Sequence, residues 1–295
     1  MLSELQGDTF LPVSYSRTKR IFFLAISLVH YSIQCVRKWT NLLLGDQPTG
    51  TCAVLYYHDI GPCQDRFAQQ MQYLARWAIP LPANFKAPLK NGKRYTCITF
   101  CDGFICFLEK ALPELVKHNI PATIFVPSGY LGTCPGWADD NDHPGLVDQI
   151  IMDAEQLKSL PTDLVIVGSH GVFHKNLSSL CRCEAGEELF RSKQDLERII
   201  QREVKLFFFP YGGYNKTSLE LAREAGYDRV FCTVPRPAFR NPNEFLSGAI
   251  IVDPGDWLLE FKLKVLGGYN WLSLIASAKQ SLTRLKRNQP RSGSS

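Results

Sequence analysis

Short apolar segments alternate with segments of helical periodicity along most of this chain. The apolar segments have no polar face, and glycine, proline or a polar residue follows most of them. They predict buried strands at residues 51–57, 95–100, 122–126, 164–167, 206–209 and 229–233. The intervening segments place apolar side chains on one face, which predicts helices at residues 66–77, 104–118, 155–160, 187–200 and 218–225.

This alternation indicates the fold class. Strands that are apolar throughout are covered on both faces, and strands that alternate with helices form parallel sheets. We therefore predict an α/β fold, a (β/α) barrel of about six to eight units that is distorted or incomplete. Functional groups in such barrels lie at the carboxyl ends of the strands. We expect them here after Tyr57, Phe100, Val167 and Phe209.

Two flanking segments differ from this central region, residues 50–256. The N-terminal segment, residues 1–48, contains an apolar run from Ile21 to Val36 with basic residues on both sides. The run is shorter than the roughly 20 residues of a bilayer span, and no small-residue cleavage site follows it. A packing helix, a membrane-surface helix and a short anchor stay open as interpretations. The C-terminal segment, residues 257–295, is apolar and basic, which predicts amphipathic helices packed on the barrel or on a membrane.

Composition narrows the function classes. With 45% hydrophobic residues in 295 positions, the chain can bury a core and is not disordered. The net charge of +5 lies mostly near the ends, and no zinc-finger spacing or base-reading helix is present, so we expect no nucleic-acid partner. The ten cysteines form no CxxC pair, which favours a reducing compartment. Together with the lack of a clear cleavable signal peptide, this favours a cytoplasmic or membrane-associated location.

Three polar groups follow the predicted strands. Asp102 ends one strand, His170 and His174 follow another, and Pro210 and Tyr211 follow a third. The histidines are four positions apart, so both imidazoles would point the same way if the backbone there were helical. Two histidines and a carboxylate leave positions for water on a catalytic zinc, which polarises an acyl oxygen and acidifies that water. Alone, such histidines are often surface or capping residues; their shared place at strand ends favours a metal site.

These groups resemble, in order, the first three motifs of the polysaccharide deacetylases, the NodB-homology family, also called carbohydrate esterase family four. The resemblance runs from about Val54 to about Thr233 and includes the segments Tyr57-His58-Asp59 and Ala225-Gly226-Tyr227. It implies a NodB-type barrel and a metal-dependent hydrolase that removes N-acetyl groups from an amino-sugar polysaccharide or oligosaccharide, such as exopolysaccharide.

The resemblance also implies roles for individual residues. Asp102, His170 and His174 would bind a divalent metal, zinc above all, with cobalt or nickel as alternatives. Pro210 and Tyr211 would form the wall of the substrate groove, and the Tyr211 N–H would help to hold the oxyanion. His58 would lie at the rim of the same pocket. The partner implied is an acetylated amino-sugar polymer.

Three positions depart from the family pattern. Cys101 stands where the family has the aspartate that acts as general base, and Phe208 stands where many members have an arginine that orients this base. Gly171 replaces a serine or threonine, and no clear histidine follows Thr233 to act as general acid. A Cys101 thiolate could act as the base or bind the metal. The sequence therefore predicts a carbohydrate N-deacetylase or, alternatively, a catalytically impaired glycan-binding relative in polysaccharide assembly.

Overall fold

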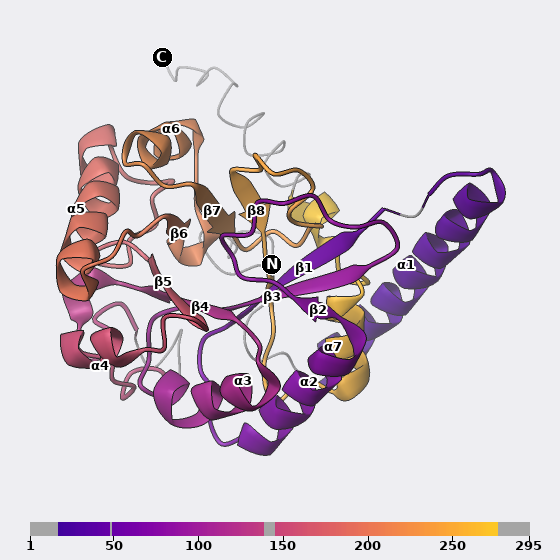
Figure 1. The fold of residues 1–295 in the computed structure, drawn as a ribbon, viewed down its shortest axis with the longest axis horizontal. Helices are drawn as coiled ribbons and strands as arrows, with labels where there is room; N and C mark the ends of the chain where they lie inside the picture. The colour runs from indigo at the N-terminus through magenta and orange to yellow at the C-terminus, as the bar shows by residue number, and fades with distance from the viewer. Residues whose placement is uncertain (1–16, 48, 139–144, 277–295) are drawn as a thin grey trace, which may run out of the picture.

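A nearly closed parallel barrel forms the centre of the molecule, as the sequence predicted (Figure 1). The computed structural model describes residues 17–47, 49–138 and 145–276. The strands follow the order β8-β7-β6-β5-β4-β3-β1-β9, and β2 pairs with β3. Their bounds are β1 Thr51–Tyr57, β2 Ile79–Pro80, β3 Arg94–Phe100, β4 Ala122–Val126, β5 Val165–Ser169, β6 Leu206–Phe208, β7 Arg229–Cys232, β8 Leu246–Gly248 and β9 Ile250–Ile251.

One short segment joins the two edges of the sheet. Its first half, β8, pairs with β7, and its second half, β9, pairs with β1, with only Ala249 between them. The Ala249 N–H donates to the Cys232 carbonyl at 2.8 Å, and the Val252 N–H donates to the Tyr56 carbonyl at 2.9 Å. The sequence analysis did not find these strands, because two or three residues are too few to show a period.

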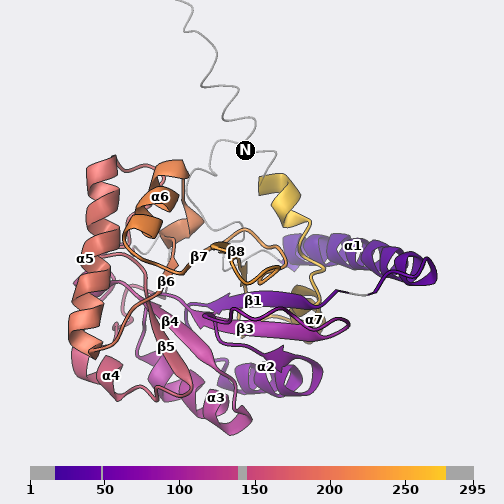
Figure 2. The same ribbon diagram turned by 45° about the horizontal axis from the view of Figure 1, so that its top comes forward.

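Helices cover the outside of the barrel (Figures 1 and 2). Each of the five predicted helices is present. The segment predicted as one helix at residues 104–118 begins with a π-helical turn, η1, at Phe107–Ala111. The helices are α2 Gln64–Trp77, α3 Leu112–His118, α4 Ala154–Ser159, α5 Arg182–Ile200 and α6 Lys216–Glu224, with 3-10 turns η2 at Ser128–Tyr130 and η3 at Pro210–Gly212.

Aromatic side chains from separate strands fill the barrel. The Phe208 ring lies 5.2 Å from Tyr56, 5.4 Å from Phe125 and 6.0 Å from Phe231, measured between ring centroids. These residues come from β6, β1, β4 and β7, so they meet only because the sheet curls round on itself. Gly168 leaves room for this packing, since a Cβ there would lie 2.5 Å from the Phe125 ring.

The N-terminal helix α1, Arg17–Leu43, packs on the barrel through one face. Ser27 on this face accepts a hydrogen bond from the Trp271 indole at 2.9 Å, and Arg20 pairs with Glu260 of α7, Leu258–Val265, at 2.6 Å. In the part of the chain that is described, no helix combines the length and apolar character needed to cross a bilayer. Residues 1–16 and 277–295 of the predicted end segments lie outside the described residues.

Candidate metal centre

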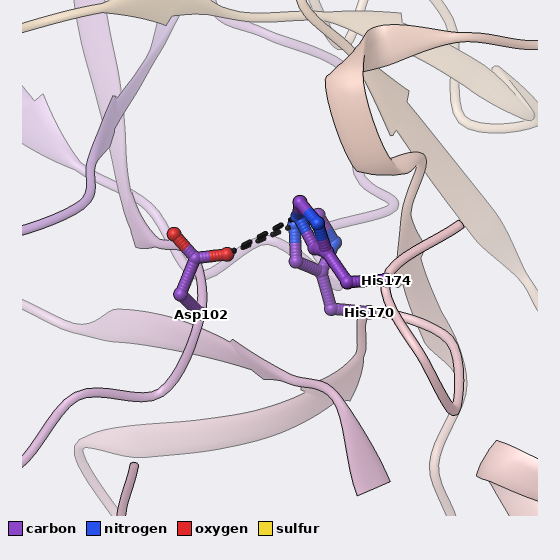
Figure 3. Close-up of side chains that lie close together, drawn as sticks. All are labelled: Asp102, His170 and His174. Atoms are coloured by element: carbon purple, nitrogen blue, oxygen red, sulfur yellow. Dashed lines mark ion pairs between the residues drawn. The ribbon is translucent and has the colours of Figure 1, made fainter. Parts of the chain in front are cut away.

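Asp102, His170 and His174 converge at the carboxyl ends of the strands, where the sequence analysis expected the chemistry (Figure 3). Asp102 follows β3, and the two histidines follow β5. The Asp102 Oδ1 atom lies 3.5 Å from His170 Nε2 and 3.3 Å from His174 Nε2. One potential ligand atom from each residue lies within 4.8 Å of the others, and all three residues are buried. The described residues thus contain a group that could hold a metal ion.

The hydrogen bonds of this group fit a bound cation. His170 Nδ1 lies 2.7 Å from the Phe208 carbonyl oxygen, which can only accept, so Nδ1 carries the proton. A neutral His170 therefore presents the Nε2 lone pair to Asp102, whose buried Oδ1 has no hydrogen-bond partner. Two acceptors facing each other repel unless a cation lies between them. Two imidazole nitrogens and one carboxylate oxygen are donors that zinc accepts, so the residues fit this metal.

The burial of the centre controls its protonation. Burial would by itself raise the pKa of Asp102, but contact with His174 and the nearby His58 and His170 hold it well below its usual range. Burial, and after it the neighbouring His174, lowers the pKa of His170 to about 3. At neutral pH the centre therefore holds an ionised carboxylate opposite a neutral His170, the protonation states that metal binding requires.

The metal-free protein should lose stability in acid because of His170. Its folded pKa of about 3 lies below the unfolded value of 6.5, so the unfolded chain binds more protons between these two pH values. The free energy of unfolding should fall by about 2–3 kcal/mol between pH 7 and pH 4.5 through this group. Urea unfolding with a chelator present should show this fall. His170→Gln should reduce it and His118→Gln should not, whereas equal falls in all three proteins would contradict the assignment.

The loop that carries the two histidines is not helical, so helical spacing does not explain their convergence. Gly171 has φ +82° and His174 has φ +54°, both in the left-handed region. Buried Glu188 of α5 holds the loop, since its Oε2 accepts from the Val172 N–H at 2.8 Å and the Phe173 N–H at 2.9 Å. A Cβ on Gly171 would lie 2.7 Å from this oxygen. Glycine at position 171, where the family has serine or threonine, therefore fits beside the Glu188 carboxylate. The sequence analysis did not select Glu188.

Removing the Glu188 carboxylate should loosen the loop. Glu188→Ala leaves the buried Val172 N–H and the part-buried Phe173 N–H without their acceptor, at roughly 1–3 kcal/mol each, so we expect about 3 kcal/mol lower stability. Zinc affinity should also fall, because His174 lies at the end of this loop. Glu187→Ala is the matched control, since the Glu187 side chain is 61% exposed on the same helix. Unfolding and zinc titration test both variants, and equal losses in the two would show that Glu188 has no special role.

The predicted groove residues surround the centre. The His58 Nε2 atom lies 3.9 Å from Asp102 Oδ2, and its side chain is 19% exposed. The Tyr211 ring centroid lies 4.7 Å from that of His174, and Tyr211 has φ +56° in the turn that Pro210 begins. Trp137, which the sequence analysis did not select, stacks on His174 with 4.2 Å between centroids. These positions place His58, Tyr211 and Trp137 next to the same centre.

Cys101 precedes Asp102 and is completely enclosed. Burial raises the pKa of the Cys101 thiol well above its ordinary value, and the Asp102 charge raises it further. The thiol is therefore neutral at neutral pH, and Cys101 is outside the group of potential ligands found among the described residues. Phe208, in the position of the orienting arginine, is 1% exposed within the aromatic packing. Cys101 and Phe208 thus place a neutral thiol and an apolar ring at the two positions where the family pattern has an aspartate and an arginine.

Comparison with known proteins agrees with this centre. The sequence profile of the polysaccharide deacetylase family matches residues 89–230, which contain Asp102, His170, His174 and Tyr211. Residues 89–230 are thus similar to the polysaccharide deacetylase family. A Staphylococcus aureus relative, a poly-beta-1,6-N-acetyl-D-glucosamine N-deacetylase, is 25% identical over 195 residues, which are 63% of each protein. The Bacillus subtilis protein YxkH is 25% identical over 166 residues, 56% of this chain and 54% of YxkH.

Solved deacetylase structures share the fold. IcaB from Ammonifex degensii superposes with a TM-score of 0.60 and 21% identity, covering 75% of this chain and 100% of that one. The Streptococcus pyogenes deacetylase PplD gives a TM-score of 0.58 and 20% identity, covering 75% of this chain and 98% of that one. At this identity the likeness establishes the barrel. The chain spans about half the length of the curated relatives that it matches, from 37% to 63%.

Proposed function

We propose that the protein is a metal-dependent hydrolase that removes N-acetyl groups from an amino-sugar polysaccharide or oligosaccharide. The observation that carries the proposal is the buried Asp102–His170–His174 group, whose facing acceptors fit a divalent cation. Poly-N-acetylglucosamine is the favoured substrate class, because a Staphylococcus aureus relative is named as its N-deacetylase. We propose zinc as the metal, since two histidines and one carboxylate form a typical catalytic zinc set.

The three ligands and the groove residues have distinct proposed roles. Asp102, His170 and His174 would hold the metal, which supplies a Lewis acid for the acetamide carbonyl and lowers the pKa of nearby water. The His170 ring is oriented by the Phe208 carbonyl, which fixes Nε2 as the atom that faces Asp102. Tyr211, Pro210 and His58 would contact the sugar, and the Tyr211 N–H would stabilise the oxyanion.

The buried, neutral thiol of Cys101 favours a second function, the binding of acetylated glycan with slow turnover. A buried neutral thiol is a poor general base, and the loss of a general base typically slows a reaction about 10²–10⁴-fold. The protein would then bind acetylated glycan at the metal centre, turn it over slowly, and act mainly in polysaccharide assembly. We retain slow deacetylation as the leading proposal, because the predicted metal ligands are all present and converge.

The test is acetate release from β-1,6-linked N-acetylglucosamine oligomers by zinc- or cobalt-loaded protein, compared with chelator-treated protein. Metal-dependent release supports the deacetylase. Oligomer binding without release, in protein shown to contain metal, supports the glycan-binding alternative. Release that is unchanged by the chelator would rule out the proposed mechanism.

A membrane surface is the second partner that we propose. Support comes from α1, whose outward face is apolar and whose charged residues are all basic.

A further inference from the structure

Exposed apolar side chains are concentrated on one helix. Half of the large apolar side chains that are exposed in the described chain lie on α1. Trp39 is 70% exposed and Leu43 is 78% exposed, although such side chains normally avoid water. The principal members of this group, which we call the α1 apolar face, are Phe22, Val29, Ile33, Val36, Trp39 and Leu43.

The α1 apolar face points away from the barrel. Most of its members follow one another at intervals of three, four or seven residues, which places them on one side of a helix. Ser27 and Arg20, on the opposite side, contact Trp271 and Glu260 of the body. Figure 2 shows α1 along the edge of the molecule, with its C-terminal part extending beyond the strands. The apolar face is therefore the outer surface of the protein on this side.

The charges of α1 have a single sign. Between Arg17 and Leu43 there are five basic residues and no acidic one. Arg37 and Lys38 have no acidic ion-pair partner in the described part of the chain. With Arg236 they line a cavity of about 290 Å³ between α1 and the barrel, and its lining contains no aspartate or glutamate.

An anionic lipid surface fits both properties. An amphipathic helix with basic and aromatic residues lies in the bilayer interface, where its apolar face enters the acyl boundary and its cations meet acidic headgroups. A second copy of the chain fits less well, because the basic residues of α1 would meet no acidic residue on a second α1.

We propose that α1 docks this protein on an anionic membrane, with its apolar face in the lipid and the barrel on the aqueous side. The helix is about 40 Å long, since each residue advances 1.5 Å. Its N-terminal end contacts Gly255, which follows β9, and its Gln34 to Lys38 turn lies beside Thr51, where β1 begins. The helix therefore runs from the carboxyl end of the barrel, where the candidate metal centre lies, towards its amino end. Docking through α1 would hold this centre close to the membrane surface. This orientation favours, as the substrate, an acetylated polymer held at the membrane surface. This part of the inference rests on the proposed deacetylase function.

Binding of the full chain to vesicles tests the docking surface without any measurement of activity. We expect binding to phosphatidylcholine vesicles that contain phosphatidylglycerol, much weaker binding to phosphatidylcholine alone, and weaker binding as salt increases. Val29→Ser/Trp39→Ser should weaken binding at least tenfold. The matched control is Val116→Ser/Trp77→Ser, because Val116 is 56% exposed and Trp77 is 61% exposed on other helices. Arg37→Gln/Lys38→Gln should reduce the preference for the anionic vesicles.

Each other outcome would overturn the docking proposal. Equal binding by the Val29/Trp39 variant and its control would exclude α1. A dimer in the wild type that the Val29/Trp39 variant loses, without vesicle binding by either protein, would identify a second copy as the occupant. Equal binding to neutral and anionic vesicles would contradict the role of the basic residues. Since vesicle binding is read without substrate, failure of the deacetylase proposal would leave these results unchanged.

Discussion

Acetate release should rise about 10²-fold or more when Cys101→Asp is combined with Phe208→Arg. With the arginine present, a carboxylate at position 101 should be ionised at neutral pH, whereas burial keeps the native thiol protonated. A positioned general base typically contributes about 10²–10⁴-fold. Cys101→Asp alone should gain less, because a second buried carboxylate beside Asp102 is driven towards its protonated form. The arginine supplies the opposite charge, and initial rates with zinc-loaded proteins measure the gain.

The matched control for this pair is Cys101→Asn with Phe208→Arg. Asparagine has the shape of aspartate but cannot accept a proton from water, so this variant should stay at the wild-type rate. An equal gain in both double variants would contradict the general-base explanation. Phe208 packs against Tyr56, Phe125 and Phe231, so urea unfolding and zinc content must show that both variants are folded and loaded. A folded, loaded Asp/Arg variant with no gain would show that position 101 is not the site of the missing base.

The longer elements of the barrel could be predicted from the sequence because their signals are local. Residues 51–57 are apolar throughout, and a buried parallel strand needs nothing else. The closing segment gave no such signal. Leu246–Gly248 and Ile250–Ile251 are strands only because β7 and β1 are within reach on either side. Closure depends on the tertiary structure, and no local pattern of two or three residues encodes it.

The convergence of the three candidate ligands could be predicted from the sequence, but their geometry could not. Strand ends and family motifs identified Asp102, His170 and His174, which the structure brings together. The helical spacing considered for the histidines does not apply, since Gly171 and His174 adopt left-handed backbone angles instead. Glu188 and Trp137 were missed because they lie distant in sequence from the histidine they support or contact. Contacts between separate elements become visible only in the folded chain.

What the sequence could predict about α1 was limited in a similar way. The apolar run at residues 21–36 was compatible with packing, with a membrane surface and with a short anchor. The structure adds that one face contacts Trp271 and Glu260, while the other face is exposed. Amphipathic periodicity identifies two faces in a sequence, but only the fold shows which of them the protein covers.

Asp102→Asn, His170→Gln and His174→Gln should each abolish tight zinc binding and reduce acetate release to background. Each change removes one of three donors, and the remaining two do not complete a catalytic zinc set. Zinc should raise the thermal midpoint of the wild type, because a ligand at 100 times its Kd stabilises the folded state by about 2.7 kcal/mol. The same addition should leave the three variants nearly unchanged. His118→Gln, a change in α3 outside the centre, should keep the wild-type response. If Asp102→Asn bound zinc as the wild type does, the metal would lie elsewhere, and the convergence of these three buried residues would need another explanation.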